Sequence, residues 1–144
     1  MAITATRFHD FCAGHRVLGH ENKCRHLHGH NYRVHFTIQA IDGLDSIGRV
    51  LDFSVIKTLL CDWLELNWDH KTLLYREDPL VKELQKITPD DIVTVPFNPT
   101  AENMARFLVE QVGPATLDGL GVELVKCVVE ETRKCSASYE ITSK

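Results

Sequence analysis

The chain has 144 residues, of which 44% are hydrophobic and 25% charged, and its formal net charge is −4. This is the composition of a globular protein, and we expect a single domain over residues 1–144. The net negative charge argues against a nucleic-acid-binding protein. No apolar run approaches the ~20 residues of a membrane span. The start of the chain has no apolar run typical of a secretory signal, and the five cysteines are scattered. We therefore expect a cytoplasmic protein with free thiols.

The first third of the chain predicts strands. Residues 3–12 are typical of a strand, although their alternation is irregular. From His30 to Ala40 apolar and polar residues alternate strictly, which predicts a half-buried strand. Asp42-Gly43 begins a turn, and residues 48–53 predict a short returning strand.

The pattern then changes to helical spacing. Ser54 is a plausible N-cap, and apolar residues recur every three or four positions to about Leu66. A second long helix is predicted from Thr100 to Gly113-Pro114, where the glycine and proline would end it. The shorter predicted elements are a helix over 79–84, an extended segment over 92–95, and strands over 125–131 and 135–141.

Strands, then helices, then strands predict the α+β class, with a four-stranded antiparallel sheet and two long helices on one face. One sheet face and the outer strand edges would stay open, and proteins seldom leave long strand edges unpaired. We therefore expect oligomerisation that closes the sheets into a ring.

Five of the chain's eight histidines fall between positions 15 and 30, and neutral imidazole is a common zinc ligand. His28 and His30 are two residues apart, so both side chains would point to the same face of a strand. A third imidazole would leave one tetrahedral position open, as in catalytic zinc sites. His15 or His20 could supply it. His26 shares the alternation of the pair, so the spacing leaves the ligand set open.

Cys24 differs from the other cysteines in its polar neighbours. Cys12, Cys61 and Cys127 fall within apolar patterns, and we expect them in the core. Cys24 lies close to a lysine and an arginine, which favour the thiolate. That thiolate could be a fourth zinc ligand, which would make the site structural, or it could be a nucleophile or a general base.

Two acidic positions have a candidate chemical role. Asp69-His70 follows the first long helix and could form an acid–base relay, or simply a surface turn. Glu131 ends a strand side that is apolar at positions 125, 127 and 129, so its carboxylate needs a partner or reaches solvent. The two N–H groups of a pterin or guanine edge would be suitable partners. Glu102 lies in a first helical turn, where the helix dipole favours an acidic residue in any case.

Taken together, these residues resemble the motifs of the 6-pyruvoyltetrahydropterin synthase / 6-carboxytetrahydropterin synthase family over nearly the whole chain. In order, the matching motifs are Phe11-Cys12-Ala13-Gly14-His15, Cys24 followed by His28-Gly29-His30-Asn31-Tyr32, Asp52-Phe53, Asp69-His70, Pro99-Thr100-Ala101-Glu102-Asn103 and Glu131-Thr132. Three residues separate the cysteine from His-Gly-His. That spacing is similar to the bacterial branch, which makes 6-carboxytetrahydropterin on the route to queuosine, whereas the animal pyruvoyl synthases have a longer insert.

The resemblance implies a T-fold, in which trimers form a barrel and two trimers stack into a homohexamer. It implies a zinc-dependent lyase that converts 7,8-dihydroneopterin triphosphate to 6-carboxy-5,6,7,8-tetrahydropterin, with release of triphosphate and acetaldehyde. By the resemblance, His15, His28 and His30 would be the Zn²⁺ ligands. Cys24 would abstract a proton, with Asp69 and His70 as its relay. Glu131 would bind the pterin, and Thr100 and Glu102 would line the pocket from a neighbouring subunit.

Some alternatives stay open at this stage. A 6-pyruvoyltetrahydropterin synthase would eliminate triphosphate from the same substrate without releasing acetaldehyde. A non-catalytic zinc-binding module would use Cys24 as the fourth ligand. Glu130 stands where many relatives have lysine, so either Glu130 or Glu131 could face the pterin. Arg16, Lys23 and Arg25 are candidates for the triphosphate site on charge alone.

Overall fold

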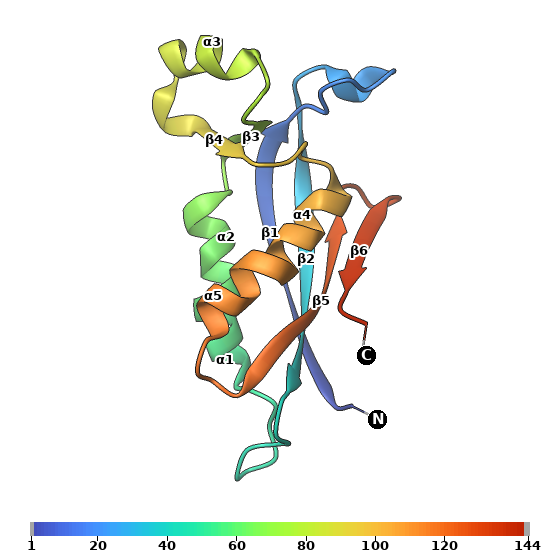
Figure 1. Ribbon diagram of the computed structural model, residues 1–144, viewed down its shortest axis with the longest axis vertical. Helices are drawn as coiled ribbons and strands as arrows, with labels where there is room; N and C mark the ends of the chain where they lie inside the picture. The colour runs from blue at the N-terminus through green and yellow to red at the C-terminus, as the bar shows by residue number, and fades with distance from the viewer. Residues whose placement is uncertain (1, 143–144) are drawn as a thin grey trace.

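The computed structural model describes residues 2–142, in which six strands form one mixed sheet (Figure 1). The strand order is β4-β3-β1-β2-β5-β6. Neighbours among β1, β2, β5 and β6 are antiparallel, whereas β3 runs parallel to β1 and β4 parallel to β3. The strands are β1 Thr4–His15, β2 His28–Ala40, β3 Lys71–Tyr75, β4 Ile92–Val95, β5 Val122–Glu130 and β6 Ser136–Glu140.

The α+β class is confirmed, but the sheet is mixed and has six strands rather than the four antiparallel strands expected. β3 is the strand that the sequence pattern missed, and β4 is the extended segment expected over 92–95. Leu73 and Leu74 of β3 are both fully buried, so both faces of this strand are covered. A five-residue strand buried on both faces shows no alternation, and its pattern cannot be separated from that of a helix end.

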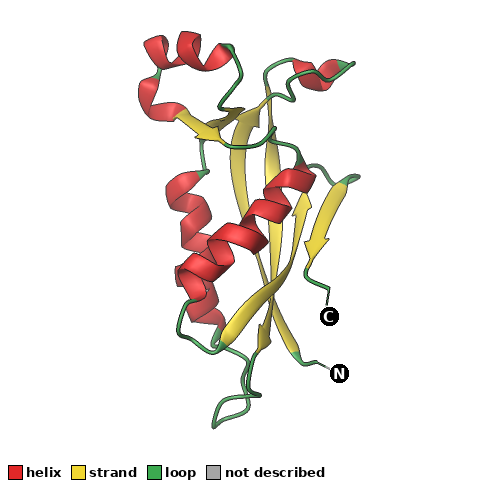
Figure 2. Cartoon of the chain, viewed as in Figure 1, coloured by secondary structure: helices red, strands yellow, loops and turns green. Residues whose placement is uncertain are grey.

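Two long helices cover one face of the sheet (Figure 2). Each is interrupted by a π-helical segment of five residues. The first consists of α1 Phe53–Ile56, the π segment Lys57–Cys61 and α2 Asp62–Asn67. The second consists of α4 Ala101–Phe107, the π segment Leu108–Val112 and α5 Gly113–Leu117, and a separate helix, α3, spans Leu80–Ile87.

The second long helix was expected to end at Gly113-Pro114, but it continues to Leu117. Proline lacks an N–H and is tolerated in the first turn of a helix, where that donor has no partner in any case. The π segment shifts the hydrogen-bond register immediately before Pro114, so the proline lies in the first turn of α5.

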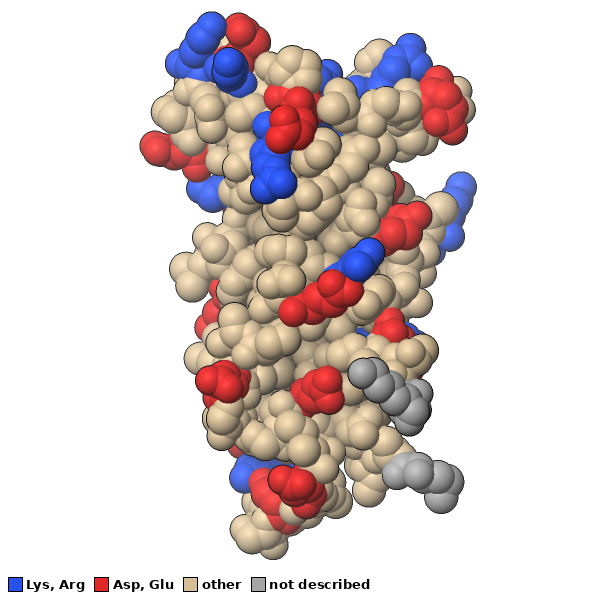
Figure 3. Space-filling view, in the orientation of Figure 1, with Lys and Arg blue, Asp and Glu red and all other residues tan. Residues whose placement is uncertain are grey.

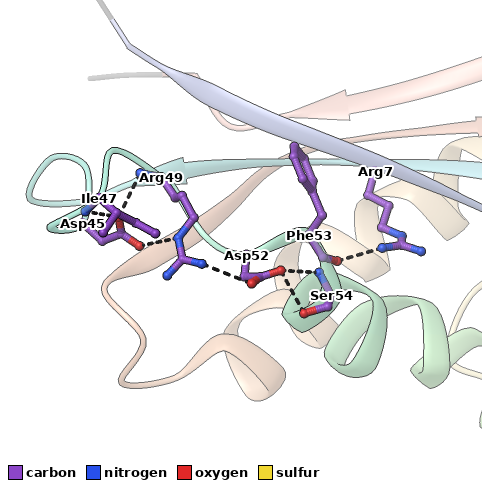
Figure 4. Close-up of polar contacts among 7 residues, drawn as sticks. All are labelled: Arg7, Asp45, Ile47, Arg49, Asp52, Phe53 and Ser54. Carbon is purple, nitrogen blue, oxygen red and sulfur yellow. Dashed lines mark hydrogen bonds and ion pairs between the residues drawn. The ribbon is translucent and has the colours of Figure 1, made fainter.

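The strand predicted over 48–53 is not formed, because side chains satisfy the backbone of this loop (Figure 4). The Asp45 carboxylate accepts hydrogen bonds from the amides of Ile47 and Arg49, at 3.1 and 2.9 Å. Asp52 accepts one from the amide of Ser54 at 2.8 Å and is the N-cap of α1, the role expected of Ser54. Local bonds of this kind compete with strand pairing.

The core lies between the two long helices and the inward face of the sheet. On β2 the expected alternation is confirmed, since Val34, Phe36 and Ile38 are fully buried. Leu64 and Leu108, also fully buried, belong to the same core cluster from the helices. Val125 departs from its expected place on the buried side of β5, because a bulge changes the register with β2 between Thr37 and Ile38.

All five cysteines are unpaired. Cys61 and Cys127 are buried, as predicted, but Cys12 is exposed, and its thiol donates a hydrogen bond to the side chain of Asn31 at 2.9 Å. Cys12 lies on the outward side of β1, which the irregular alternation of that strand concealed.

The sequence argued against a membrane span and against nucleic-acid binding, and the helices and the surface can be compared with these two expectations. No helix within residues 2–142 combines the length and the apolar character needed to cross a membrane. On the face drawn in Figure 3, basic side chains are interspersed with acidic ones and do not form a continuous basic surface.

We predict that Gly113→Ala destabilises the protein by about 1–3 kcal/mol, although alanine is normally the better helix former. An added Cβ would lie 2.8 Å from the Cβ of Leu124, which overpacks the contact between α5 and β5. Chemical denaturation measures the change. The double variant Gly113→Ala/Leu124→Ala should lose less stability than the sum of the two single variants, and strict additivity would contradict this account.

Candidate metal centre and active site

The pairing of β1 with β2 brings three histidines together. His15 at the end of β1 lies opposite His28 at the start of β2, and Ala13 lies opposite His30. One ligand atom from each of His15, His28 and His30 lies within 4.8 Å of the others, and within residues 2–142 these three alone form such a group of histidine, cysteine or carboxylate side chains. His20 and His26, which the spacing left as alternatives, are outside the group.

Backbone carbonyls set the tautomers of two of these histidines. The Nδ1 atom of His15 lies 2.7 Å from the carbonyl oxygen of Pro99, and that of His28 lies 2.7 Å from the carbonyl oxygen of His26. A carbonyl oxygen only accepts hydrogen bonds, so each Nδ1 carries the hydrogen and each Nε2 presents a lone pair. Hydrogen bonds from the other ring nitrogen to a backbone carbonyl are usual for histidines that bind a metal.

The two Nε2 atoms lie 3.1 Å apart. Two lone pairs at this distance repel each other unless a cation lies between them. In a tetrahedral zinc site with Zn–N bonds of about 2.0–2.1 Å, neighbouring nitrogens are about 3.3 Å apart. The donor set and its spacing therefore fit a metal ion of this kind, and three protein ligands leave a fourth position open.

His30 completes the group. Its Nε2 atom is buried and has no hydrogen-bond partner within residues 2–142, and the Oε1 atom of Glu131 lies 3.3 Å away. Buried ring nitrogens are normally hydrogen-bonded, so one without a hydrogen bond in a group of three imidazoles is a candidate metal ligand. The hydroxyl of Tyr32 is the other buried, unpaired side-chain atom within the described residues.

Burial keeps two of the three histidines in the neutral form that a metal requires. His15 is only 1% exposed, and burial lowers its pKa from 6.5 to about 4, with the hydrogen bond to Pro99 acting in the opposite direction. Burial also lowers the pKa of His30, while the nearby charge of Glu131 opposes the shift. At neutral pH both imidazoles are therefore uncharged and able to coordinate a cation.

Cys24 lies in a short 3₁₀ turn, Lys23–Arg25, in the loop that joins β1 to β2. The turn is tied back to the end of β1 by a hydrogen bond of 2.8 Å from the amide of Val17 to the carbonyl of Cys24. The thiol is partly exposed and is not part of the three-histidine group. This arrangement favours a free thiol over a fourth metal ligand.

Asp69 and His70 form the dyad that the sequence indicated. The Oδ2 atom of Asp69 lies 2.8 Å from Nδ1 of His70, and its Oδ1 accepts a hydrogen bond of 2.9 Å from the amide of Cys12. Burial would raise the pKa of Asp69, but the hydrogen bonds from Cys12 and His70 outweigh it and leave the pKa lowered. The carboxylate is thus charged, and it orients an imidazole whose side chain is 79% exposed.

The dyad and the thiol are not brought together within one chain. His70 precedes β3 and borders a shallow pocket of about 430 Å³, whose floor is the glycine pair of β1 and β2. Cys24 does not line this pocket. The residues that line it are Cys12, Ala13, Gly14, Gly29, His30, Asn31, His70, Lys71 and Thr72.

The two candidate carboxylates at the end of β5, Glu130 and the following residue Glu131, face opposite sides of the sheet. Glu131 lies beside His30, whereas Glu130 pairs with His35, a residue on the outward side of β2. Of the two, Glu131 is therefore the carboxylate at the histidine cluster.

Thr100 follows Pro99, whose carbonyl contacts His15 of the same chain. Its hydroxyl caps α4 by accepting a hydrogen bond from the amide of Asn103 at 3.1 Å. Glu102 is exposed in the first turn of the same helix. Arg16 is not free for phosphate, since its guanidinium is paired with the buried carboxylate of Asp78.

Two contributors to the site were missed by the sequence reasoning. The carbonyl of Pro99 fixes the tautomer of a histidine 84 residues away, and no sequence pattern signals a backbone acceptor. Tyr32 shares the alternation of His28 and His30, which could have placed its side chain on the same face.

The chain is similar to several known proteins. The profile of the 6-pyruvoyl tetrahydropterin synthase family matches residues 4–142. The 6-carboxy-5,6,7,8-tetrahydropterin synthase of Rickettsia typhi is 38% identical over 134 residues, which cover 92% of this chain and 96% of the relative. The protein of the same name from Aquifex aeolicus is 35% identical over 127 residues, with coverages of 83% and 76%.

Two solved structures share the fold. An uncharacterized protein from Wolinella succinogenes matches with a TM-score of 0.83 at 25% identity, over 97% of this chain and 98% of that one. The 6-pyruvoyl tetrahydropterin synthase of Caenorhabditis elegans matches with a TM-score of 0.67 at 24% identity, over 99% and 97% of the two chains. At that identity the second likeness concerns the fold alone.

We predict that the metal-free protein loses stability as the pH falls from about 6.5 to about 4. The unfolded chain protonates His15 over this range while the folded chain does not, so the unfolded state binds more protons. The loss attributable to His15 is at most about 3 kcal/mol. Denaturation at several pH values in the presence of a chelator measures it. His15→Gln should have a clearly shallower slope, and an unchanged slope would contradict the prediction.

Proposed function

The chain belongs to the 6-pyruvoyl tetrahydropterin synthase family, and on that basis we propose that it is a zinc-dependent 6-carboxy-5,6,7,8-tetrahydropterin synthase. Four curated relatives of that name are 35–38% identical to it. The proposed substrates are 7,8-dihydroneopterin triphosphate and one water molecule, and the other proposed products are triphosphate and acetaldehyde. The observation that carries the proposal is the pair of Nε2 lone pairs of His15 and His28, 3.1 Å apart, beside the unpaired Nε2 of His30.

The three histidines would hold the ion, and zinc bound there would act as a Lewis acid toward the hydroxyl-bearing side chain of the substrate. Cys24 takes a proton from that side chain, at a carbon made acidic by the adjacent imine of the dihydropterin. Its position outside the histidine group supports this role, because a thiolate bound to the metal would be a weaker base. Glu131, at the edge of the same group, accepts hydrogen bonds from the N–H groups of the pterin ring.

His70 returns a proton during the internal redox shift, with Asp69 holding its Nδ1–H so that Nε2 faces outward. This role is supported by the hydrogen bonds of Asp69 to both Cys12 and His70. Cys24 and His70 lie apart in one chain, and we propose that neighbouring copies complete the relay in a homohexamer made of two trimers. The outer strands β4 and β6 and the sheet face without helices are the surfaces available for this assembly. We place the reaction in the cytoplasm.

Incubation of the zinc-loaded protein with 7,8-dihydroneopterin triphosphate should yield 6-carboxytetrahydropterin together with acetaldehyde, as identified by mass spectrometry. Release of triphosphate with 6-pyruvoyltetrahydropterin and no acetaldehyde would assign the chain to the other reaction of its family. No conversion by metal-loaded protein would overturn the proposed function.

We predict that Cys24→Ala retains the metal but loses turnover by at least about 10²-fold, because the general base is removed. His28→Ala should lose both the metal and the activity. Metal content by elemental analysis and the rate of triphosphate release measure the two effects. Cys135→Ala is the matched control and should change neither, because it alters an exposed thiol and leaves the backbone hydrogen bond of Cys135 to Glu131 in place.

Cobalt substitution provides an independent test of the same assignment. A thiolate ligand to Co²⁺ gives an intense charge-transfer band, and three histidine ligands do not. We expect no such band in the wild-type protein. Its presence, together with loss of metal from Cys24→Ala, would mean that Cys24 closes a structural site.

A further inference from the structure

The hydroxyl of Tyr32 is buried without a partner. The Tyr32 side chain is fully buried, and within residues 2–142 only its hydroxyl and the Nε2 atom of His30 are buried side-chain nitrogen or oxygen atoms without a hydrogen bond. A buried polar group in this state is unfavourable, and native structures rarely keep one without a use. The proposed metal accounts for the His30 atom, whereas none of the steps above involves the Tyr32 hydroxyl.

Tyr32 borders the three-histidine group directly. It is the next inward-facing residue on β2 after His28 and His30. Its ring meets those of His30 and His15 edge-on, with centroids 5.4 and 5.9 Å apart and interplanar angles of 78° and 82°. On its other side the ring stacks on Phe11 at 5.1 Å, which fixes its orientation.

The phenol of Tyr32 is neutral at neutral pH, since the ordinary pKa of a tyrosine side chain is about 10. Its hydroxyl is therefore a hydrogen-bond donor on a ring that contacts His30, the histidine beside which Glu131 lies. A phenol O–H is suited to an oxygen acceptor, whereas the Glu131 carboxylate is suited to ring N–H groups.

We propose that Tyr32 is a substrate-binding residue, whose hydroxyl donates a hydrogen bond to a hydroxyl oxygen of the pterin's side chain next to the three histidines. This inference rests on the proposed function and adds a specificity determinant to it. The site would thereby distinguish pterins that carry a hydroxylated side chain from those without one, since only the former gain this hydrogen bond on binding.

The test compares Tyr32→Phe with the wild type, both loaded with zinc, using two unreactive probes. One is neopterin, which has the trihydroxypropyl side chain without phosphate, and the other is pterin, which has no side chain. By calorimetry, Tyr32→Phe should bind neopterin about tenfold more weakly, the loss expected for one buried hydrogen bond. Its affinity for pterin and its metal content should not change.

Thermal unfolding of the metal-free variants tests the unpaired state of the hydroxyl. Because the hydroxyl has no partner in the chain, Tyr32→Phe should leave the unfolding midpoint unchanged or raise it. Tyr139→Phe is the matched control, since the Tyr139 hydroxyl donates a hydrogen bond to Glu110 at 2.6 Å. That variant should lower the midpoint and leave the affinity for both probes unchanged.

Two results would overturn the inference while the proposed function stands. One is equal binding of neopterin by Tyr32→Phe and the wild type, and the other is a lowered unfolding midpoint in metal-free Tyr32→Phe. A wild-type protein that binds neither probe and converts no substrate would overturn the proposed function, and the inference with it.

Discussion

The antiparallel pairing of β1 with β2 is the interaction on which the rest of the site depends. Its register places His15 opposite His28, Ala13 opposite His30 and Phe11 opposite Tyr32. A shift of one residue would turn the histidines of one strand to the other face of the sheet. The buried inward side chains of both strands oppose such a shift, so the hydrophobic core holds the metal centre at its end.

Two backbone carbonyls then prepare the histidines for a cation. The carbonyl of Pro99, immediately before α4, and that of His26, in the loop before β2, hold the two Nδ1–H groups and direct both Nε2 atoms to one point. Burial keeps His15 uncharged, which costs stability at acidic pH but leaves the ligand ready to bind. A metal bound to this group stabilises the folded state over the unfolded one, so folding and metal binding are linked.

The Asp69–His70 dyad depends on β1 in a different way. His70 has a φ of 59°, a left-handed conformation that costs about 1–2 kcal/mol for a residue other than glycine. Two backbone hydrogen bonds of Cys12 stabilise this conformation. The carbonyl of Cys12 accepts a hydrogen bond from the amide of His70, and its amide donates one to the carboxylate of Asp69. One strand therefore positions the histidine cluster on its inward face and the relay at its edge.

The sequence alone determined the elements whose side chains alternate or recur over many residues, such as β2 and the two long helices, and it named the candidates for the chemically active residues. It did not determine β3, which is too short and too fully buried to show a period, or the loop over 48–53, where Asp45 and Asp52 replace strand pairing with local hydrogen bonds. Only the tertiary structure decided which histidines meet, that Glu131 rather than Glu130 faces them, and that Tyr32 lies among them unpaired. The physical reason is that these contacts join residues far apart in the chain, through strand register and backbone carbonyls that no local pattern encodes.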